Sequence, residues 1–405
     1  MNVVMTAYSI DPRGGSEKKN AWDWVMSALV AGHHVTLVTT PEGAKAVQNF
    51  REETKLDFLN VIPLEKPSVT NLFGSQLQMY MQYVKWQKSV GILFSREESL
   101  NFNAGVHTSW GNVLLESGLT EYSFPVVIYP SGGGNFTLKG AASFYGKGRY
   151  EATMDSFLRR LLRLRPAARK SLRRSALVLA ENGQTAALAK GMGAKRVIID
   201  FAATVKQAEI VSDRSNPNSL KFLWVGRLRP RKGALLALMA FHEVVKKVPH
   251  AQLTVVGDGA MKLQLENYVR KMNLVKNVTF TGAVTFSEVQ NLYLTHSYFI
   301  FSSLRDATGS QVLEAAAKGL PIITLQGLGI EEWISESFTL FANRLGSAKS
   351  TSWSSALKDA IVKATEITPS EWKTMSDEAR VFASRHTYEH KMLKISAMID
   401  SVSGI

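Results

Sequence analysis

The chain has 405 residues, of which 45% are hydrophobic and 20% charged, and this balance excludes a disordered or fibrous protein. The length exceeds one ordinary core and predicts two domains, while the absence of cysteine excludes disulfides and thiolate metal sites. Because no apolar run is long enough to span a membrane and the N-terminus lacks the basic start and apolar run of a secretory signal, we expect a cytoplasmic protein.

The first half of the chain alternates short apolar runs with helical stretches. A glycine turn at Gly14 and Gly15 leads into a helical pattern over Ser16–Ala31, which is the spacing of a strand, helix, strand unit. The strand candidates are Val3–Ala7, His34–Thr39, Phe58–Pro63, Gly105–His107 and Pro125–Tyr129. The pattern predicts an α/β, doubly wound N-terminal domain over residues 1–204.

A polar stretch, Ala202–Ser219, predicts a domain boundary, and a second alternating unit follows it over residues 205–385. Ala234–Val248 is typical of the helices between its strands. The strand candidates are Lys221–Val225, Gln252–Val256, Asn277–Thr281, Tyr298–Ser302 and Pro321–Leu325. We expect two such sheets facing a central cleft, with a final helix within residues 386–405 crossing back to the first domain.

A basic turn follows the first strand candidate of the second unit. Arg227 and Lys232 lie in the predicted turn between a strand and a helix, where their positive charges could bind a diphosphate. Each charge-assisted hydrogen bond of this kind contributes on the order of 1.5–3 kcal/mol. The alternative is a solvated basic turn without a ligand.

A pair of carboxylates, Asp306 and Glu314, lies eight positions apart around a predicted helix start. Gly309, Ser310 and Gln311 open that helix, where unpaired backbone N–H groups bind anions. Such a pair suits both the sugar and the ribose of one nucleotide-sugar. The alternative makes Asp306 a helix cap and Glu314 an exposed helical residue.

Seven motifs, in this order, resemble the retaining glycosyltransferases of family 4, of the bacterial polysaccharide type. They are GGSE from Gly14, VHTSWGN from Val106, YPSGGGN from Tyr129, VGRLRPRKG from Val225, VVGDG from Val255, VTFTG from Val278 and RDATGSQVLEAAAKGLP from Arg305. The resemblance covers most of the chain. It implies the GT-B architecture, with two Rossmann-like doubly wound domains, and a nucleotide-sugar-dependent hexosyltransferase that retains the anomeric configuration.

The resemblance also implies roles for single residues. Glu314 would hold the ribose, Asp306 the hydroxyls of the donor sugar, and Arg227 with Lys232 the diphosphate. Gly15 would let the first helix approach the phosphates. Because the chain has no Asp-x-Asp motif, we expect a metal-independent enzyme without a cofactor, in which these cations and helix N-termini replace the metal.

By the same resemblance, His107 would lie against the transferred sugar, although a single histidine at a strand end is more often structural. The likeness favours front-face attack, with the departing diphosphate taking the acceptor's proton. The chain departs from the family in having Asp306 where glutamate is usual and Asn135 after the glycine triplet. Residues Gln326–Gly329 match the family's glycine pair near the sugar only loosely, so Glu331 is a speculative sugar contact.

The formal net charge is +14, and eight of the lysines and arginines lie between Arg159 and Arg174 with no acid among them, so the N-terminal half would be neutral without this stretch. Leucines at helical spacing among the cations predict docking on an anionic membrane, and a solvated helix face is an equal alternative. The residues expected at the membrane or acceptor are Arg159, Arg160, Arg163, Arg169, Lys170 and Arg173.

These features together predict a cytoplasmic enzyme, peripheral on the inner face of the membrane, that adds a sugar to a glycan or lipid-linked acceptor in surface polysaccharide assembly. A nucleotide-sugar epimerase is an alternative, with His107 and Asp306 as its acid/base candidates. A basic nucleic-acid-binding protein is a distant third, because only Phe157 among the arginines offers a ring for base stacking. We therefore expect no nucleic-acid partner.

Overall fold

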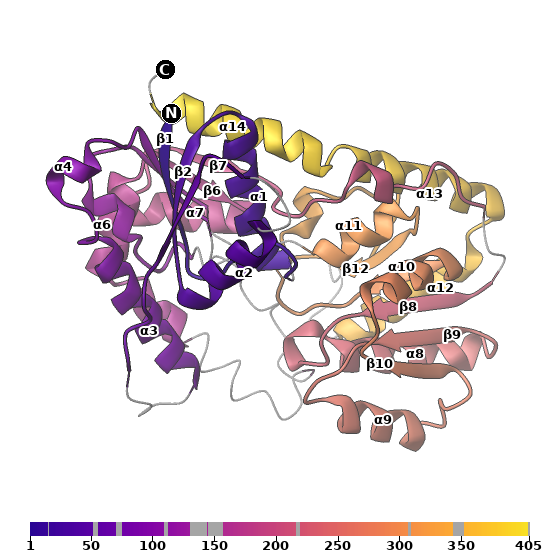
Figure 1. Ribbon diagram of the computed structural model, residues 1–405. Helices are drawn as coiled ribbons and strands as arrows, with labels where there is room; N and C mark the ends of the chain where they lie inside the picture. Colours follow the sequence, from indigo (N-terminus) through magenta and orange to yellow (C-terminus); the bar gives the residue numbers. More distant parts are fainter. Residues whose placement is uncertain are drawn as a thin grey trace. The chain divides into compact units, whose positions relative to one another are not determined.

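The computed structural model describes residues 1–14, 16–51, 56–69, 75–108, 112–129, 144, 157–215, 219–306, 309–342 and 352–403. The chain divides into two compact α/β units (Figure 1). Unit 1 comprises Met1–Gly134, Leu158–Ala202 and Tyr388–Ile405, and unit 2 comprises Asn135–Phe157 and Ala203–Thr387. Each unit is built around one parallel sheet.

The sheet of unit 1 has seven parallel strands in the order β3-β2-β1-β4-β5-β6-β7. Their bounds are β1 Asn2–Ala7, β2 His34–Thr39, β3 Leu59–Pro63, β4 Ala104–His107, β5 Val126–Ile128, β6 Leu177–Ala180 and β7 Val197–Ile199. Alternate side chains serve opposite faces, so Val3 and Met5 belong to one buried cluster and Val4 to another. Both faces are therefore covered, which explains why strands such as β5 and β6 are apolar throughout.

The helices of unit 1 supply the two apolar layers. They are α1 Ser16–Val30, α2 Pro41–Arg51, α3 Ser75–Val90, α4 Arg96–Ser99, α6 Pro166–Arg174, α7 Gly183–Met192 and α14 Tyr388–Ser403, with a 3-10 turn η1 Gly118–Glu121. The helix α14 packs against α1 (Figure 1) and places Ile395 and Ile399 in the cluster that contains Trp24. The last helix thus completes the core of unit 1.

A buried ion pair ties α14 to the end of β7. Lys391 pairs with the carboxylate of Asp200, donates to the carbonyl of Phe201 at 3.0 Å, and lies 5.5 Å from the ring centroid of Tyr129. The side chains of the pair are only 8% and 7% exposed, so each charge depends on its partner.

We expect Lys391→Met to destabilise the protein by about 3–5 kcal/mol, because it leaves the buried Asp200 charge unpaired. Denaturant unfolding measures this loss. The double variant Lys391→Met/Asp200→Leu removes both charges and should recover most of the stability. Equal losses in the single and double variants would contradict a coupled pair.

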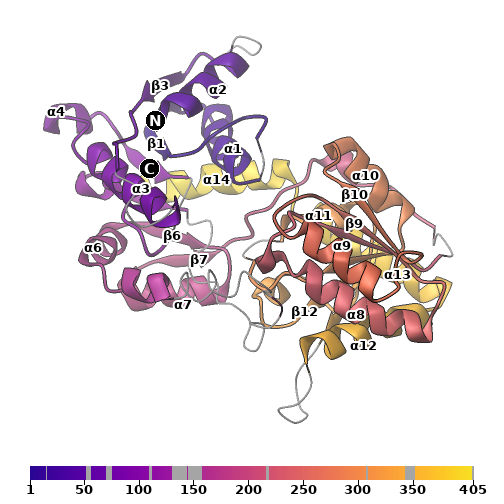
Figure 2. The same cartoon turned by 90° about the horizontal axis from the view of Figure 1, so that it is seen from below.

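The sheet of unit 2 has six parallel strands in the order β10-β9-β8-β11-β12-β13. Their bounds are β8 Lys221–Val225, β9 Gln252–Val256, β10 Val278–Gly282, β11 Tyr298–Phe301, β12 Ile322–Leu325 and β13 Thr339–Ala342. The helices are α8 Ala234–Lys247, α9 Lys262–Lys271, α10 Phe286–Thr295, α11 Ser310–Ala317, α12 Trp353–Glu366 and α13 Pro369–Ser384. Short 3-10 turns are η3 Gln207–Glu209, η4 Pro230–Lys232 and η5 Ile330–Glu332. Figure 2 shows α8 beside α9, a pair that the residue contacts confirm.

Both sheets reverse their strand order at one point, β1 beside β4 in unit 1 and β8 beside β11 in unit 2. This is the doubly wound topology, and the prediction of two parallel α/β sheets is confirmed. In such sheets, ligands bind beyond the carboxyl ends of the strands where the order reverses. The topology therefore predicts that a ligand of unit 2 binds at the segments that follow β8 and β11.

Candidate nucleotide-sugar site

The segments after β8 and β11 start from neighbouring strands. The two strands are parallel and pair Phe222 with Tyr298 and Leu223 with Phe299, so both end at the same edge of the sheet. The segment after β8 carries the basic turn, and the segment after β11 carries both carboxylates. Two motifs that are more than 70 positions apart in sequence thus meet at the reversal point.

The centre of this site is an ion pair between Lys232 and Asp306. The ammonium lies 2.5 Å from the carboxylate oxygen Oδ2, and the two side chains are 13% and 15% exposed. Ser303 donates its hydroxyl to the same oxygen at 3.3 Å, and the N–H of Gly309 donates to Oδ1 at 3.4 Å. Asp306 therefore organises the start of α11 as well as pairing with the lysine.

The electrostatics keep Asp306 charged. Burial alone would raise the pKa of this carboxyl, but the Lys232 ammonium, the Arg231 guanidinium and the Gly309 N–H hold the pKa below its ordinary value. Burial in turn lowers the pKa of Arg231, as do the charges of Arg305, Arg229 and Arg227, and Asp306 opposes them. The edge of the sheet thus gathers more cations than one carboxylate neutralises, which suits a diphosphate.

Two glycines allow close packing at this edge of the sheet. Gly233 has φ +70°, and a Cβ there would lie 1.9 Å from the carbonyl oxygen of Ser302. Gly309 has φ +56°, and a Cβ there would lie 2.3 Å from Cδ1 of Ile330. Only glycine fits these positions without moving backbone or core. The backbone thus holds the Lys232 turn against the end of β11.

Glu314 lies farther along α11, and its carboxylate is largely enclosed. Burial raises the pKa of Glu314 to about 7, and the charge of Glu209 adds to this, while a hydrogen bond from Tyr293 and the charge of Lys232 oppose it. The hydroxyl of Tyr293, a fully buried residue of α10, donates to Oε2 at 3.2 Å. Near neutral pH this carboxyl therefore changes charge readily, as functional carboxylates often do.

The other residues predicted to contact the donor lie at the start of α11, after β8 and in segments outside the described residues. Ser310 and Gln311 form the first turn of α11, and the carbonyl of Gln311 accepts a hydrogen bond from Tyr293 at 3.5 Å. Arg227 is exposed. Gly15 lies outside the described residues, as do the glycine triplet and Asn135. Glu331 accepts N–H bonds from Gly327 and Gly329 at 2.8 and 2.9 Å, so its oxygens hold their own loop.

His107 ends β4, and only 2% of its surface is exposed. Its Nδ1 is bonded to the hydroxyl of Thr6 at 2.9 Å and its Nε2 to the hydroxyl of Tyr83 at 2.8 Å. Burial lowers the pKa of this histidine to about 4, so the ring is neutral. With both nitrogens engaged inside unit 1, the imidazole acts here as a link between β4 and α3.

The basic segment of residues 157–174 is partly neutralised by unit 1 itself. Arg165 pairs with Glu116 at 2.6 Å, and Glu121 pairs with both Lys170 and Arg174, at 2.8 and 3.0 Å. Arg160 and Arg173 are exposed, whereas Arg159, Arg163 and Arg169 are half-buried. Large exposed apolar side chains stand among the cations: Phe157 at 55%, Leu161 at 49% and Leu164 at 70%.

Sequence reasoning did not identify Tyr293 and Ser303, and it placed Arg231 in the turn without a role. Tyr293 reads as an ordinary apolar position of a helix, and nothing in its neighbours marks the hydroxyl. Its importance follows from the tertiary contacts of its hydroxyl with Gln311 and Glu314 of α11.

Fold and site together define a two-unit α/β protein with a cation-rich edge on the sheet of unit 2. Residues 205–364 match the family described as glycosyl transferases group 1. The whole chain has the GT-B fold, as predicted. A structure of the Anabaena protein HepE, in complex with UDP and glucose, aligns over 100% of both chains with a TM-score of 0.63 and 15% identity.

Relatives with curated descriptions match over shorter segments. An uncharacterized glycosyltransferase of Methanocaldococcus jannaschii is 35% identical over 108 residues, which is 26% of each chain. One subunit of the phosphatidylinositol N-acetylglucosaminyltransferase of Arabidopsis thaliana is 30% identical over 149 residues, 37% of this chain and 33% of the relative. The matches thus span about a quarter to a third of these relatives.

Proposed function

We propose that the protein is a retaining hexosyltransferase that moves a sugar from a nucleotide diphosphate sugar to a glycan or lipid-linked acceptor in surface polysaccharide assembly. The observation that carries the proposal is the buried Lys232–Asp306 pair, which lies with Glu314 at the β8/β11 edge. The UDP and glucose bound to HepE support a nucleotide-sugar donor.

The proposed chemistry relies on positioning and charge. Lys232, Arg227 and the N-terminal amides of α11 hold the diphosphate and stabilise the negative charge that grows on it as the sugar leaves. Glu314 accepts hydrogen bonds from the ribose hydroxyls, and Asp306 accepts them from the sugar. The acceptor hydroxyl attacks the face that the diphosphate leaves, and the diphosphate oxygen takes its proton. No step in this scheme requires a metal.

A peripheral place on the cytoplasmic face of an anionic membrane completes the proposal. Within the described residues, the structure has no helix long and apolar enough to cross a membrane. Exposed Phe157, Leu161 and Leu164 beside Arg160 and Arg173 supply both contributions that surface docking needs, apolar insertion and attraction to anionic headgroups. The likeness to part of a phosphatidylinositol-modifying transferase favours a lipid-linked acceptor.

The decisive experiment is a thermal-shift screen of uridine, guanosine and adenosine diphosphate sugars. We expect one nucleotide to raise the melting temperature by several degrees at a concentration of 100 times its Kd, because that binding stabilises the fold by about 2.7 kcal/mol. Product analysis with lipid-bound acceptors then tests transfer. Incubation with donor alone tests the epimerase alternative, since an epimerase interconverts the sugar without acceptor. Failure of every nucleotide-sugar to bind would overturn the proposal.

A further inference from the structure

The hydroxyl of Tyr293 lies inside unit 2, against the helix that carries Glu314. The residue belongs to α10 and has no exposed surface, and its ring packs edge-on against Phe299 of β11 with the centroids 5.6 Å apart. The hydroxyl donates to Oε2 of Glu314 at 3.2 Å and lies 3.5 Å from the carbonyl oxygen of Gln311. Because a close-packed core keeps the ring in place, the hydroxyl has this position before any ligand binds.

This hydroxyl keeps its proton over the range in which Glu314 titrates. Burial and the neighbouring charge of Glu314 raise the pKa of Tyr293 well above its ordinary value. A hydroxyl that donates to a carboxylate stabilises the ionised form of that carboxylate. Tyr293 therefore favours the charge that Glu314 needs in order to accept hydrogen bonds from a ligand.

Groups from three elements act on the charge of Glu314. Burial has the largest effect and raises the pKa of this carboxyl, and the charge of Glu209 in η3 raises it further. The hydrogen bond from Tyr293 is the largest opposing effect, and the charge of Lys232 after β8 opposes burial less strongly. Tyr293 is thus the main group that keeps Glu314 ionised.

Other charged residues of the surrounding elements are engaged elsewhere. Lys318, which follows α11, donates to the backbone carbonyl of Glu209 at 2.6 Å. Glu288 at the start of α10 accepts from Thr285, and Asp377 of α13 pairs with Lys373 and Arg380.

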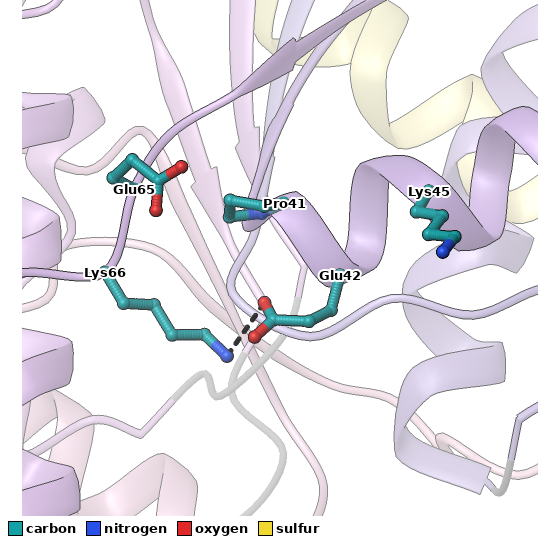
Figure 3. Close-up of a pocket in the computed structure, with 5 residues that line it drawn as sticks. All are labelled: Pro41, Glu42, Lys45, Glu65 and Lys66. Carbon is teal, nitrogen blue, oxygen red and sulfur yellow. Dashed lines mark ion pairs between the residues drawn. The ribbon is translucent and has the colours of Figure 1, made fainter.

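A carboxylate of unit 1 shows the effect of a charged partner. Figure 3 shows Glu42 of α2 pointing toward Lys66 at a hollow in unit 1, and their charged atoms are 2.9 Å apart. The hydrogen bond from Lys66 holds the pKa of Glu42 below its ordinary value. The direct partner of Glu314 is a neutral hydroxyl, and the pKa of this carboxyl is about 7. Loss of that hydroxyl should therefore be visible in titrations near neutral pH.

The hydrogen bond also fixes the direction of the Glu314 carboxylate. Within the described part of the chain, Tyr293 is the hydrogen-bond donor to this carboxylate, and it bonds to Oε2. A carboxylate has lone pairs for several donors, so Oε1 is left for ligand hydroxyls in one fixed orientation. The Glu314 side chain is only half-buried, which allows a ligand to reach it.

We propose that Tyr293 is a positioning residue for donor binding, whose hydroxyl orients the Glu314 carboxylate toward the ribose and favours its ionised form. The inference rests on the proposed function, because that function assigns the ribose to Glu314. Tyr293 itself is buried and acts on the donor only through this carboxylate.

The test is Tyr293→Phe in the full chain, which removes the hydroxyl and keeps the packed ring. Calorimetric titrations with UDP-glucose, GDP-mannose and ADP-glucose between pH 5.5 and 8.5 measure affinity. We expect the variant to bind the donor about tenfold more weakly at pH 7 and only a fewfold more weakly at pH 8.5, with the levelling of affinity moved about one unit higher. Tyr298→Phe, the same change on a buried tyrosine at the amino end of β11, should bind as the unaltered chain does.

A loss of affinity that is equal at every pH would overturn the inference, because a purely structural role produces it, and so would unchanged binding by Tyr293→Phe. Stability without ligand separates this failure from failure of the proposed function. The pKa of Glu314 is raised on folding, so its contribution to stability is lost as the pH rises through about 7, and in Tyr293→Phe this loss should extend about one unit higher.

That shift in a protein that binds none of the three nucleotide-sugars would reject the donor site and keep Tyr293 as the residue that sets the charge of Glu314. Donor binding by the unaltered chain, without any shift in Tyr293→Phe, would reject the role of Tyr293 and keep the donor site.

Discussion

Replacing Lys232 with methionine is expected to abolish detectable donor binding and to lower kcat/KM by about a hundredfold or more. The substitution keeps the apolar stem and removes the ammonium, which the proposal assigns to the diphosphate and to the charge that grows on it during transfer. Calorimetric titration with the nucleotide-sugar found in the screen measures binding, and initial rates with its acceptor measure kcat/KM. Normal donor binding by Lys232→Met would remove the foundation of the site assignment.

The same substitution also leaves the carboxylate of Asp306 without its ion-pair partner. Its effect on folding must therefore be separated from its effect on binding. Lys232 and Asp306 are both mostly buried, and the lone Asp306 charge should lower the stability of unit 2 by about 3–5 kcal/mol. The double variant Lys232→Met/Asp306→Asn removes the stranded charge. We expect it to recover stability but not donor binding. Recovery of both would mean that Lys232 serves the fold alone.

The sequence predicted the architecture because the strands of a doubly wound sheet are continuous apolar runs. The expected segment Lys221–Val225 coincides with β8, and His34–Thr39 coincides with β2. The strands β6 and β13 have only four residues each and were not predicted, and neither was β7, which has three. Runs this short give a weak periodic signal, although equally short strands, β5 of three residues and β4, β11 and β12 of four, were predicted.

The site was predictable where one local segment carries several functional groups. The segment from Asp306 to Glu314 contains both carboxylates and a helix start, and together with the basic turn at Arg227 and Lys232 it predicted a ligand site. The Lys232–Asp306 contact joins two segments that meet because β8 and β11 are neighbouring strands, and the sequence pattern does not give this strand order. The contribution of Tyr293 was not predictable, since it depends on the tertiary contacts of its hydroxyl with α11.

The second large effect is expected at Glu314, where donor binding should depend on pH. Ribose hydroxyls donate to the ionised carboxylate, yet burial raises the pKa of Glu314 to about 7, so the free protein holds a proton there at lower pH. Affinity should therefore rise up to tenfold per unit as the pH increases toward 7, and level off above it. Titrations between pH 5.5 and 8.5 test this with an intact nucleotide-sugar, whose diphosphate has no proton to lose in that range.

Glu314→Gln should weaken donor binding about ten- to a hundredfold above pH 7 and remove the slope below it, because the amide cannot ionise. Glu266→Gln on α9 is the matched control and should keep the slope. Stability gives an independent measurement. A carboxyl whose pKa is higher in the folded than in the unfolded chain stabilises the fold at low pH, and this contribution is lost as the pH rises from 4.5 through about 7. Without ligand, the unaltered chain should lose stability over that window relative to Glu314→Gln. An identical pH dependence of binding and stability in the two proteins would exclude Glu314 as the group that titrates and holds the ribose.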